Sequence, residues 1–178
     1  MTKKINRVKQ VVAALTAKVT DADREFIAKR LNLNEKKLFY GMNLPDQHHA
    51  LNVAYTAIEL AKNYPTVDKE ILVRCALLHD VGKQRGDVST WDKIITVIAH
   101  KIFPAKAKAW GRPGRGSKVS NLRHAVYLYF HHPMRSAEML LAIGTEQKIA
   151  DIIRLHHTAP LDDDSLELII LRQADDLH

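Results

Sequence analysis

Residues 71–83 read Ile71-Leu72-Val73-Arg74-Cys75-Ala76-Leu77-Leu78-His79-Asp80-Val81-Gly82-Lys83. This is an apolar stretch followed by a histidine, an aspartate and a glycine, and the predicted fold is built around it. A helix over these residues is apolar nearly all round, with Arg74 as the exception, so we expect it to be buried. It would carry His79 and Asp80 from the core to its own C-terminal end, where Gly82 is available for the cap. Cys75 is the single cysteine of the chain, and we expect it to be an inert core residue.

The rest of the chain repeats the spacing of amphipathic helices. Apolar residues recur at steps of three and four from Ile5 to Val19, and this period continues through nearly every later segment. Pro65 ends one helix, Asp68 can cap the next, and Pro133 fits a first helical position. We therefore predict an all-α fold with helices, after the N-terminal stripe, over residues 21–31, 35–40, 46–63, 68–80, 91–109, 118–130, 133–143, 146–157 and 165–177.

Length and composition indicate one globular domain. The chain has 178 residues, of which 46% are hydrophobic and 26% are charged, and these values are close to the average of globular proteins. No segment approaches the roughly 18 uninterrupted apolar residues of a membrane helix. A lone cysteine cannot form an intrachain disulfide, which fits a reducing compartment. We expect a cytoplasmic protein that has no membrane partner.

Positive charge is concentrated in one segment. The net charge is +7, and residues 93–135 hold nine Lys or Arg but no Asp or Glu. Such a block is either a solvated face or a positive field that attracts phosphate-bearing ligands. Residues 111–118 are too rich in glycine and proline to be helical, so we expect a loop. Its cations could close over the phosphates of a substrate, and they are Arg112, Arg115 and Lys118.

Histidines on apolar helix faces raise the possibility of a metal site. Ten histidines accompany one cysteine, so metal ligands would be imidazole and carboxylate groups, which suit iron, manganese, zinc or nickel. On a helix His49 falls on the apolar face, whereas His48 falls on the polar face. His156 and Asp175 continue the apolar stripes of the last two helices.

Each of these residues also has a simpler interpretation. A single histidine on an apolar face is more often a hydrogen-bonded core residue, and Asp175 could pair with Arg172 or Arg154. Buried acids are costly, however, unless they are paired or bound to a metal. Several inward histidines and acids on separate helices therefore favour a metal centre.

The motifs around these residues resemble a known family. Residues 77–83 resemble the signature of the HD superfamily of metal-dependent phosphohydrolases, in the HDIG-type variant with Val81 in place of isoleucine. Residues 49–54, 132–138, 152–157 and 174–175 resemble the remaining motifs, in the same order. The resemblance implies a single-domain HD-type helical bundle. We expect N-terminal helices over residues 1–45 to pack on a phosphohydrolase domain of residues 46–178.

The resemblance also implies a pair of divalent metal ions bridged by Asp80, with the ligands His49, His79 and Asp175 on one ion and His132, His156 and His157 on the other. Iron or manganese is expected, with zinc, nickel or magnesium as alternatives. A metal lowers the pKa of bound water from about 15.7 to about 7, so a hydroxide near the catalytic Asp80 can attack phosphorus. Lys83 is the candidate catalytic contact to a substrate phosphate.

The predicted function is hydrolysis of a phosphoester of a nucleotide, a dinucleotide or a short nucleic acid by this metal-activated hydroxide. The expected partner is a phosphorylated small molecule, above all a nucleotide, with nucleic acid as a further possibility. His157 is followed by Thr158-Ala159-Pro160 and not by the Gly-Tyr-Pro of related cyclic-di-GMP phosphodiesterases, which argues against that activity. The alternative is a non-catalytic, metal-containing module that senses a nucleotide or binds nucleic acid. The sequence does not indicate an oligomeric state.

Overall fold

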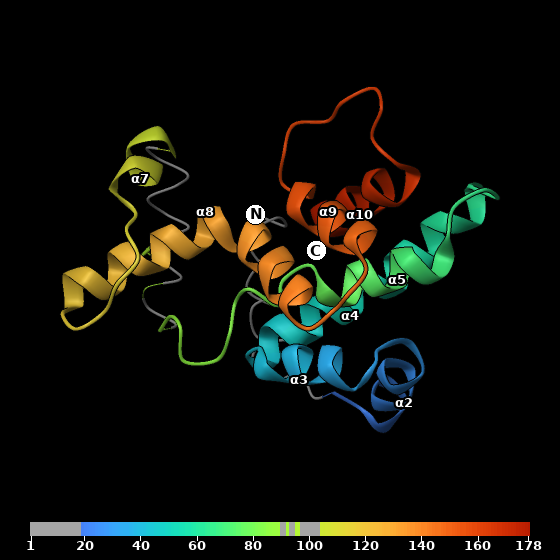
Figure 1. Cartoon of the computed structure of the whole chain (residues 1–178), viewed down its shortest axis with the longest axis horizontal. Coiled ribbons are helices and arrows are strands. Elements are labelled where there is room, and N and C mark those ends of the chain that lie inside the picture. Colours follow the sequence, from blue (N-terminus) through green and yellow to red (C-terminus); the bar gives the residue numbers. More distant parts are fainter. Residues whose placement is uncertain (1–18, 90–91, 93–94, 97–103) are drawn as a thin grey trace, which may run out of the picture.

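A computed structural model of the chain describes residues 19–89, 92, 95–96 and 104–178 (Figure 1). Every regular element among these residues is helical, as the periodicity predicts, apart from one isolated antiparallel bridge between Met42 and Gln84. The expected N-terminal helix and most of the helix expected over 91–109 lie outside the described residues. The elements are α2 (Asp21–Arg30), α3 (Leu33–Gly41), α4 (Leu44–Leu60), the short 3₁₀ helix η1 (Ala61–Asn63), α5 (Lys69–Leu78), α7 (Pro104–Trp110), α8 (Lys118–Ala142), α9 (Gln147–Leu155) and α10 (Leu166–Asp176).

Side-chain caps explain where several helices begin. Thr20 and Asn32 form capping boxes with Asp23 and Glu35 at the starts of α2 and α3. Asp68 caps α5 by accepting hydrogen bonds from two backbone N–H groups of its first turn, which confirms the predicted cap. These caps are local, so the sequence alone sets the first residue of each of these helices.

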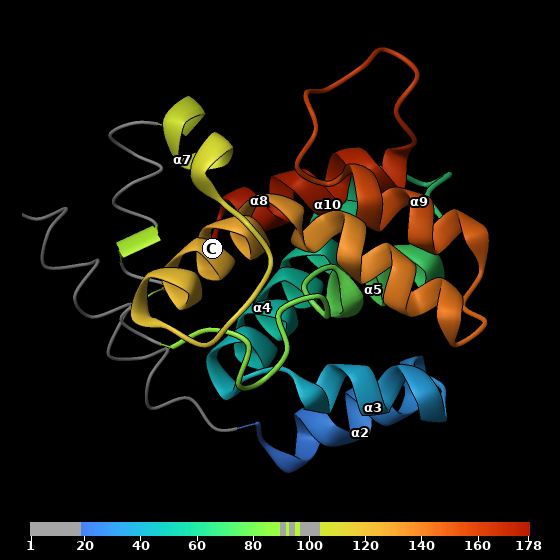
Figure 2. The same cartoon turned by 60° about the vertical axis from the view of Figure 1, so that its left-hand side comes forward.

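Helix α5 lies at the centre of the fold. It packs against α2, α3, α4, α9 and α10, and Figures 1 and 2 show α4 and α5 between α2 and α3 on one side and α9 and α10 on the other. Leu72, Leu77 and Leu78 are fully buried, as is Cys75, whose thiol is free. Each fully buried leucine contributes about 1.5–3 kcal/mol of hydrophobic stabilisation. The turn that follows α5 is therefore anchored in the core.

Arg74 is the one charged residue on the apolar helix, and two acids compensate for it. Its guanidinium lies 2.8 Å from Glu35 Oε1 and 2.6 Å from Glu146 Oε1. Glu35 is fully buried and also accepts a hydrogen bond from the hydroxyl of Thr145. A buried carboxylate is destabilising without such partners. This ion pair therefore connects α3, α5 and the start of α9.

Helix α8 is continuous, so the predicted break at Pro133 is wrong. Its 25 residues include Pro133, which is buried in the helix interior and not at a first helical position. A proline in this position removes a backbone N–H and leaves the carbonyl four residues earlier without its helical partner. That carbonyl belongs to Tyr129, and it accepts a hydrogen bond from the ring of His132 instead. The side chain before the proline thus replaces the missing donor.

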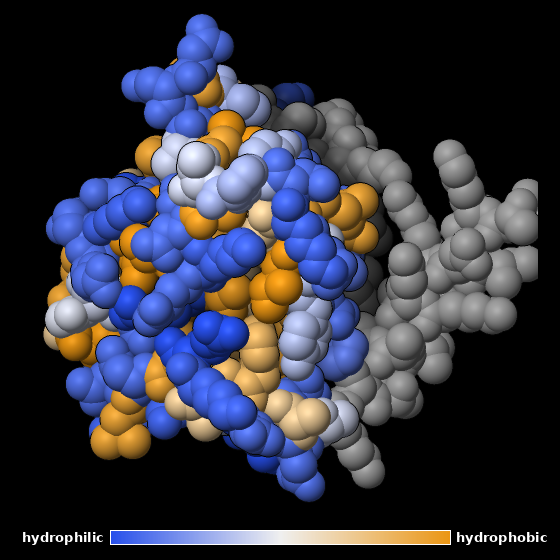
Figure 3. Space-filling model, turned by 90° about the vertical axis from the view of Figure 1, so that its right-hand side faces the viewer, coloured by the Kyte–Doolittle hydropathy of each residue, from blue (hydrophilic) through white to orange (hydrophobic). Residues whose placement is uncertain are grey.

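The described helices include no candidate membrane span. Among the described residues, no helix is long and apolar enough to cross a bilayer. Figure 3 shows a face on which hydrophilic side chains predominate and apolar side chains are interspersed among them. Scattered apolar side chains of this kind are normal on protein surfaces.

The turn after α5 packs tightly against α8. The helix ends at Leu78, with His79 and not Gly82 as its cap residue, and Gly82 does not have a positive φ. The backbone N–H of Gly82 donates a 2.8 Å hydrogen bond to Ser136 Oγ, and a Cβ at Gly82 would lie 2.6 Å from the carbonyl oxygen of His132. The glycine is therefore needed for close approach of the turn to α8 and not for capping.

We predict that Gly82→Ala lowers the free energy of unfolding by about 1–3 kcal/mol, because the added methyl group overlaps the backbone of α8. Urea unfolding followed by circular dichroism measures this change. The control is Lys62→Ala, which alters an exposed side chain and should change stability by less than about 0.5 kcal/mol. Equal stabilities of the two variants would contradict the close-approach argument.

Candidate metal centre

Seven predicted site residues converge at the end of α5. They come from five parts of the fold: His49 from α4, His79 and Asp80 from the end of α5 and the turn after it, His132 from α8, His156 and His157 from the end of α9, and Asp175 from α10. Their ligand atoms form three overlapping groups, and within each group these atoms lie within 4.8 Å of one another. A single ion could contact all members of one group.

The first group brings together residues from α4, from the end of α5 and from α10. It contains His49, His79 and Asp175. Asp175 Oδ1 lies 2.9 Å from His49 Nε2 and 3.6 Å from His79 Nε2. Asp175 forms no ion pair with Arg172 or Arg154, because these side chains pair with Asp164 and Asp151, respectively. The simple ion-pair interpretation of Asp175 therefore does not hold.

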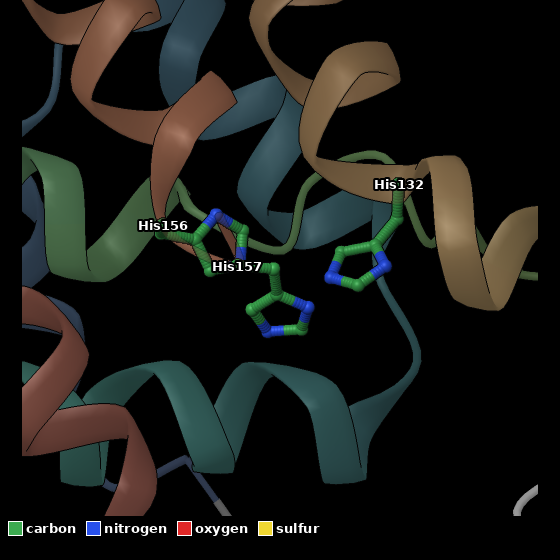
Figure 4. A group of neighbouring side chains, drawn as sticks. All are labelled: His132, His156 and His157. Carbon is green, nitrogen blue, oxygen red and sulfur yellow. The ribbon is translucent and has the colours of Figure 1, made fainter. Parts of the chain in front are cut away.

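The second group consists of three histidines. Figure 4 shows the rings of His132, His156 and His157 gathered between α8 and the end of α9. The ring centroids of His156 and His157 are 4.2 Å apart, and those of His132 and His157 are 4.8 Å apart. His132 and His156 are buried, whereas the side chain of His157 is 48% exposed. His156 and His157, although adjacent in the sequence, thus both lie close to His132.

Asp80 lies between the two groups. Its Oδ1 atom is 3.2 Å from His132 Nε2, while its Oδ2 atom is 3.6 Å from His79 Nε2 and 4.0 Å from His49 Nε2. The third group combines Asp80 with His79 and His156. One carboxylate therefore approaches ligand atoms of both outer groups, as a bridging ligand would.

Buried nitrogen atoms without hydrogen bonds fit a metal at this place. The Nδ1 atoms of His79, His132 and His156 each contact a backbone carbonyl oxygen, at 2.8, 2.9 and 2.6 Å. Their Nε2 atoms, in contrast, are buried and have no hydrogen-bond partner in the described structure. Such atoms are costly in a protein core unless a ligand satisfies them. A metal ion coordinated through Nε2 would do so, and the carbonyls hold each ring in the required tautomer.

The electrostatics of the cluster favour the protonation states that bind metals. Burial lowers the pKa of His79, and burial together with the Lys83 ammonium lowers that of His132 well below its usual range. Burial and the neighbouring histidines lower the pKa of His156 to about 3. Burial alone would raise the pKa of Asp80, but Lys83 and the histidines hold it well below its ordinary value. Neutral imidazoles and ionised carboxylates are the forms that coordinate metals.

Lys83 contacts Asp80 directly. Its ammonium lies 2.7 Å from Asp80 Oδ1 and donates a 2.8 Å hydrogen bond to Oδ2, and 28% of the side chain is exposed. Burial alone would lower the pKa of Lys83, but the negative charge of Asp80 outweighs burial and raises the pKa above its ordinary value. The amine is therefore protonated at neutral pH. The predicted catalytic lysine is thus a cation at the edge of the cluster.

Of the three predicted phosphate-binding cations of the loop, Arg115 contacts the segment that follows Lys83. Arg115 donates hydrogen bonds to the carbonyl of Gly86 and to Asp87. Arg112 and Lys118 are exposed. Lys118 begins α8, about 21 Å along the axis from His132 at about 1.5 Å per residue. His48 stays outside the cluster and contacts Asn52, in agreement with its predicted polar face.

Asp87 and Arg135 were not predicted from the sequence as residues of the site. Asp87 forms ion pairs with Arg115 and with Arg135, and Arg135 also donates to the carbonyl of Gly82. Together these contacts hold the segment after Lys83 against α8 and the loop. Asp87 lies outside the recognised motifs, and its partners come from far along the chain, so local sequence carried no signal for it.

The chain matches a known protein family. A model of the HD domain matches residues 47–178, which is most of the chain, so the chain belongs to the HD domain family. HD domains are generally metal-dependent phosphohydrolases, and the match confirms the predicted resemblance to the HD superfamily. The described helices confirm the all-α fold. No curated protein and no solved structure matches the chain.

We predict that the metal-free protein loses stability as the pH falls from 7.5 to 5.5. The unfolded chain protonates its histidines near pH 6.5. In the folded protein the pKa values of His79, His132 and His156 are lowered, so these rings resist protonation. Burial alone would lower the pKa of His49, but Asp175 raises it, so protonation of His49 stabilises the fold as the pH falls. Within the cluster, three histidines that lose stability against one that gains it give a net loss of about 2–3 kcal/mol.

Urea midpoints measured with a chelator at several pH values test this expectation. His48→Ala is the control, because this histidine lies outside the cluster and its removal should leave the slope unchanged. A midpoint that does not fall between pH 7.5 and 5.5 would show that the buried rings are readily protonated.

Proposed function

We propose that the protein is a metal-dependent phosphohydrolase that hydrolyses a phosphoester of a nucleotide, a dinucleotide or a short nucleic acid at this cluster. The observation that carries the proposal is the set of buried, unpaired Nε2 atoms around a carboxylate that approaches both outer groups. A structural core would satisfy these atoms internally. Membership of the HD domain family supports the same class of reaction.

The proposed roles follow the two groups of ligands. His49, His79 and Asp175 would hold one divalent ion, His132, His156 and His157 a second, and Asp80 would contact both. Iron or manganese is the proposed metal, since imidazole and carboxylate ligands suit both. Bound ions of this kind lower the pKa of water and neutralise charge on a phosphoryl group. The protonated Lys83 would bind a phosphate oxygen beside Asp80.

Two cavities border the cluster and support a phosphodiester substrate. One has a volume of about 180 Å³ and is lined by Lys83, Val88, Leu128 and Tyr129 among others. This is room for about one ring, because an engineered cavity of about 150 Å³ holds benzene. The other, of about 300 Å³, is lined by residues that include His157 and Asp175. A diester with its phosphorus at Asp80 would extend one substituent toward each cavity.

The basic segment supports a polyanionic substrate. Figure 1 shows α7 and the first turns of α8 extending away from the rest of the helices. Lys106, Lys108, Arg112 and Lys118 are exposed there. Because Lys118 is far from His132 along α8, its charge would serve a substrate longer than a mononucleotide. A short nucleic acid meets this requirement.

We also propose that the described part of the predicted N-terminal segment 1–45, which is residues 19–45, forms one structural domain with residues 46–178. Ile27, Leu31 and Phe39 from the first part share a hydrophobic core with α4, α5, α9 and α10. Separate domains would each need a core of their own.

A binding module without catalysis is the second candidate, and the basic segment is the observation that favours it. Such a protein would bind nucleic acid with an affinity that falls steeply with salt and does not depend on Asp80. A phosphohydrolase would instead turn over a phosphodiester only when its metal site is filled.

We predict that Asp80→Ala abolishes turnover and lowers the metal content, because it removes the carboxylate between the two groups. Protein purified without chelators or a histidine tag should contain about two first-row metal ions per chain, measured by inductively coupled plasma mass spectrometry. His48→Ala is the control, since its ring lies outside the cluster and both quantities should stay near those of the parent. Equal losses in the two variants would contradict the proposed ligand set.

We predict that Val88→Trp raises the KM for a chromogenic nucleotide diester by about tenfold, equivalent to about 1.4 kcal/mol, because the indole fills the smaller cavity. Steady-state kinetics with the p-nitrophenyl ester of thymidine monophosphate measure this change. The control is Val119→Trp, at a position on α8 that is 61% exposed and does not line this cavity. An unchanged KM in Val88→Trp would place the organic part of the substrate elsewhere.

A further inference from the structure

The three buried histidines of the cluster share one hydrogen-bond pattern. In each of them Nδ1 contacts the carbonyl oxygen three residues earlier, which belongs to Ala76, Tyr129 or Ile153. A carbonyl oxygen can only accept, so Nδ1 must carry the proton. The lone pair is then on Nε2, the atom that faces the cluster.

Within a helix a carbonyl rarely accepts such a bond from a histidine ring, because it is normally bonded to the N–H four residues later. His79 and His156 face less of this competition because they are the cap residues of α5 and α9, where the last carbonyls lack the helical N–H four residues later. The carbonyl of Ile153 also accepts the backbone N–H of His156, at 3.5 Å. Their position at a helix end therefore supplies the acceptor.

His132 has no helix end nearby, since it lies well inside the 25-residue helix α8. The N–H that would normally bond to the carbonyl of Tyr129 is that of residue 133. Residue 133 is a proline and has no N–H. His132 Nδ1 lies 2.9 Å from the carbonyl oxygen of Tyr129 and 3.3 Å from that of Leu128. Pro133 therefore makes a carbonyl acceptor accessible to His132 in the helix interior, as the helix ends do for His79 and His156.

We propose that Pro133 is a positioning residue of the metal centre. Because Pro133 has no N–H to compete for the carbonyl of Tyr129, His132 can donate to that carbonyl from Nδ1, and its Nε2 is kept directed at the cluster, 3.2 Å from Asp80 Oδ1. The inference rests on the proposed metal function of His132. Pro133 touches neither metal nor substrate in this role and acts only through the ring before it.

The test restores the missing N–H. Pro133→Ala supplies the N–H alone, and Pro133→Val supplies it while keeping most of the buried side-chain volume. In both variants the new N–H should compete for the carbonyl of Tyr129. Long-range ¹⁵N–¹H NMR spectra of the metal-free protein report the ring tautomer, with the His132 signals assigned by their absence in His132→Gln. We expect these signals to change from a single Nδ1–H tautomer in the parent to a mixture in both variants.

Metal affinity and thermal stability complete the test. Titration with Co²⁺, followed by its visible absorption, should give an affinity about 10–100-fold weaker in both variants, which is the usual effect of losing an outer hydrogen-bond partner. The unfolding temperature of the metal-free variants should not fall, because a proline inside a helix is itself unfavourable. The control Pro65→Ala changes an exposed proline before α5 and should alter neither quantity.

Several results would overturn the proposal. A parent protein in which His132 is not the Nδ1–H tautomer contradicts it directly, and so do variants that retain the parent tautomer. Weaker binding in Pro133→Ala alone, with parent-like binding in Pro133→Val, would assign the effect to side-chain packing. If the parent bound no Co²⁺, the proposed function would fail, while the NMR comparison would still decide the role of Pro133.

Discussion

The buried carboxylate of Asp80 has to be compensated by groups from several helices, because an ionised acid in a protein core is strongly destabilising on its own. Lys83 supplies one positive charge, and imidazoles from α4, α5, α8 and α9 surround the remaining space. This requirement brings together elements that are distant in the sequence. The central position of α5 is consistent with this requirement, since Asp80 lies in the turn that follows α5, and α5 packs against α4, α9 and α10, which supply other site residues.

Backbone carbonyls organise the histidines around that acid. Helix ends at His79 and His156, and a proline after His132, each leave an acceptor that the adjacent ring can use. The rings are therefore held by the main chain of their own helices and not by further side chains. The arrangement leaves several Nε2 atoms unpaired in the core, which is unfavourable for stability and suitable for binding a metal ion.

The periodicity and the motifs of the sequence predicted most of the helices and the set of residues that meet at Asp80. The helix pattern, the cap at Asp68, the inward direction of His49 and the outward direction of His48 depend on local spacing, and the described structure agrees with them. The convergence of the predicted ligands was also expected from the order of the motifs. The break at Pro133 and the capping role of Gly82 were wrong, because each rule considers only neighbours along the chain. At Pro133 the ring of His132 replaces the lost hydrogen bond, and at Gly82 the close approach of α8 decides which residue fits.

Local sequence is enough to specify the all-α class, the helix cap at Asp68 and the residue types available for chemistry, since these follow from period, capping and composition within a few turns. Only the tertiary structure decided which nitrogen of each ring faces Asp80, how Asp87 joins Arg115 to Arg135, and which cavities border the cluster. The physical reason is that these features depend on atoms from helices separated by many residues. Their relative positions are set by packing around α5, and no local pattern encodes them.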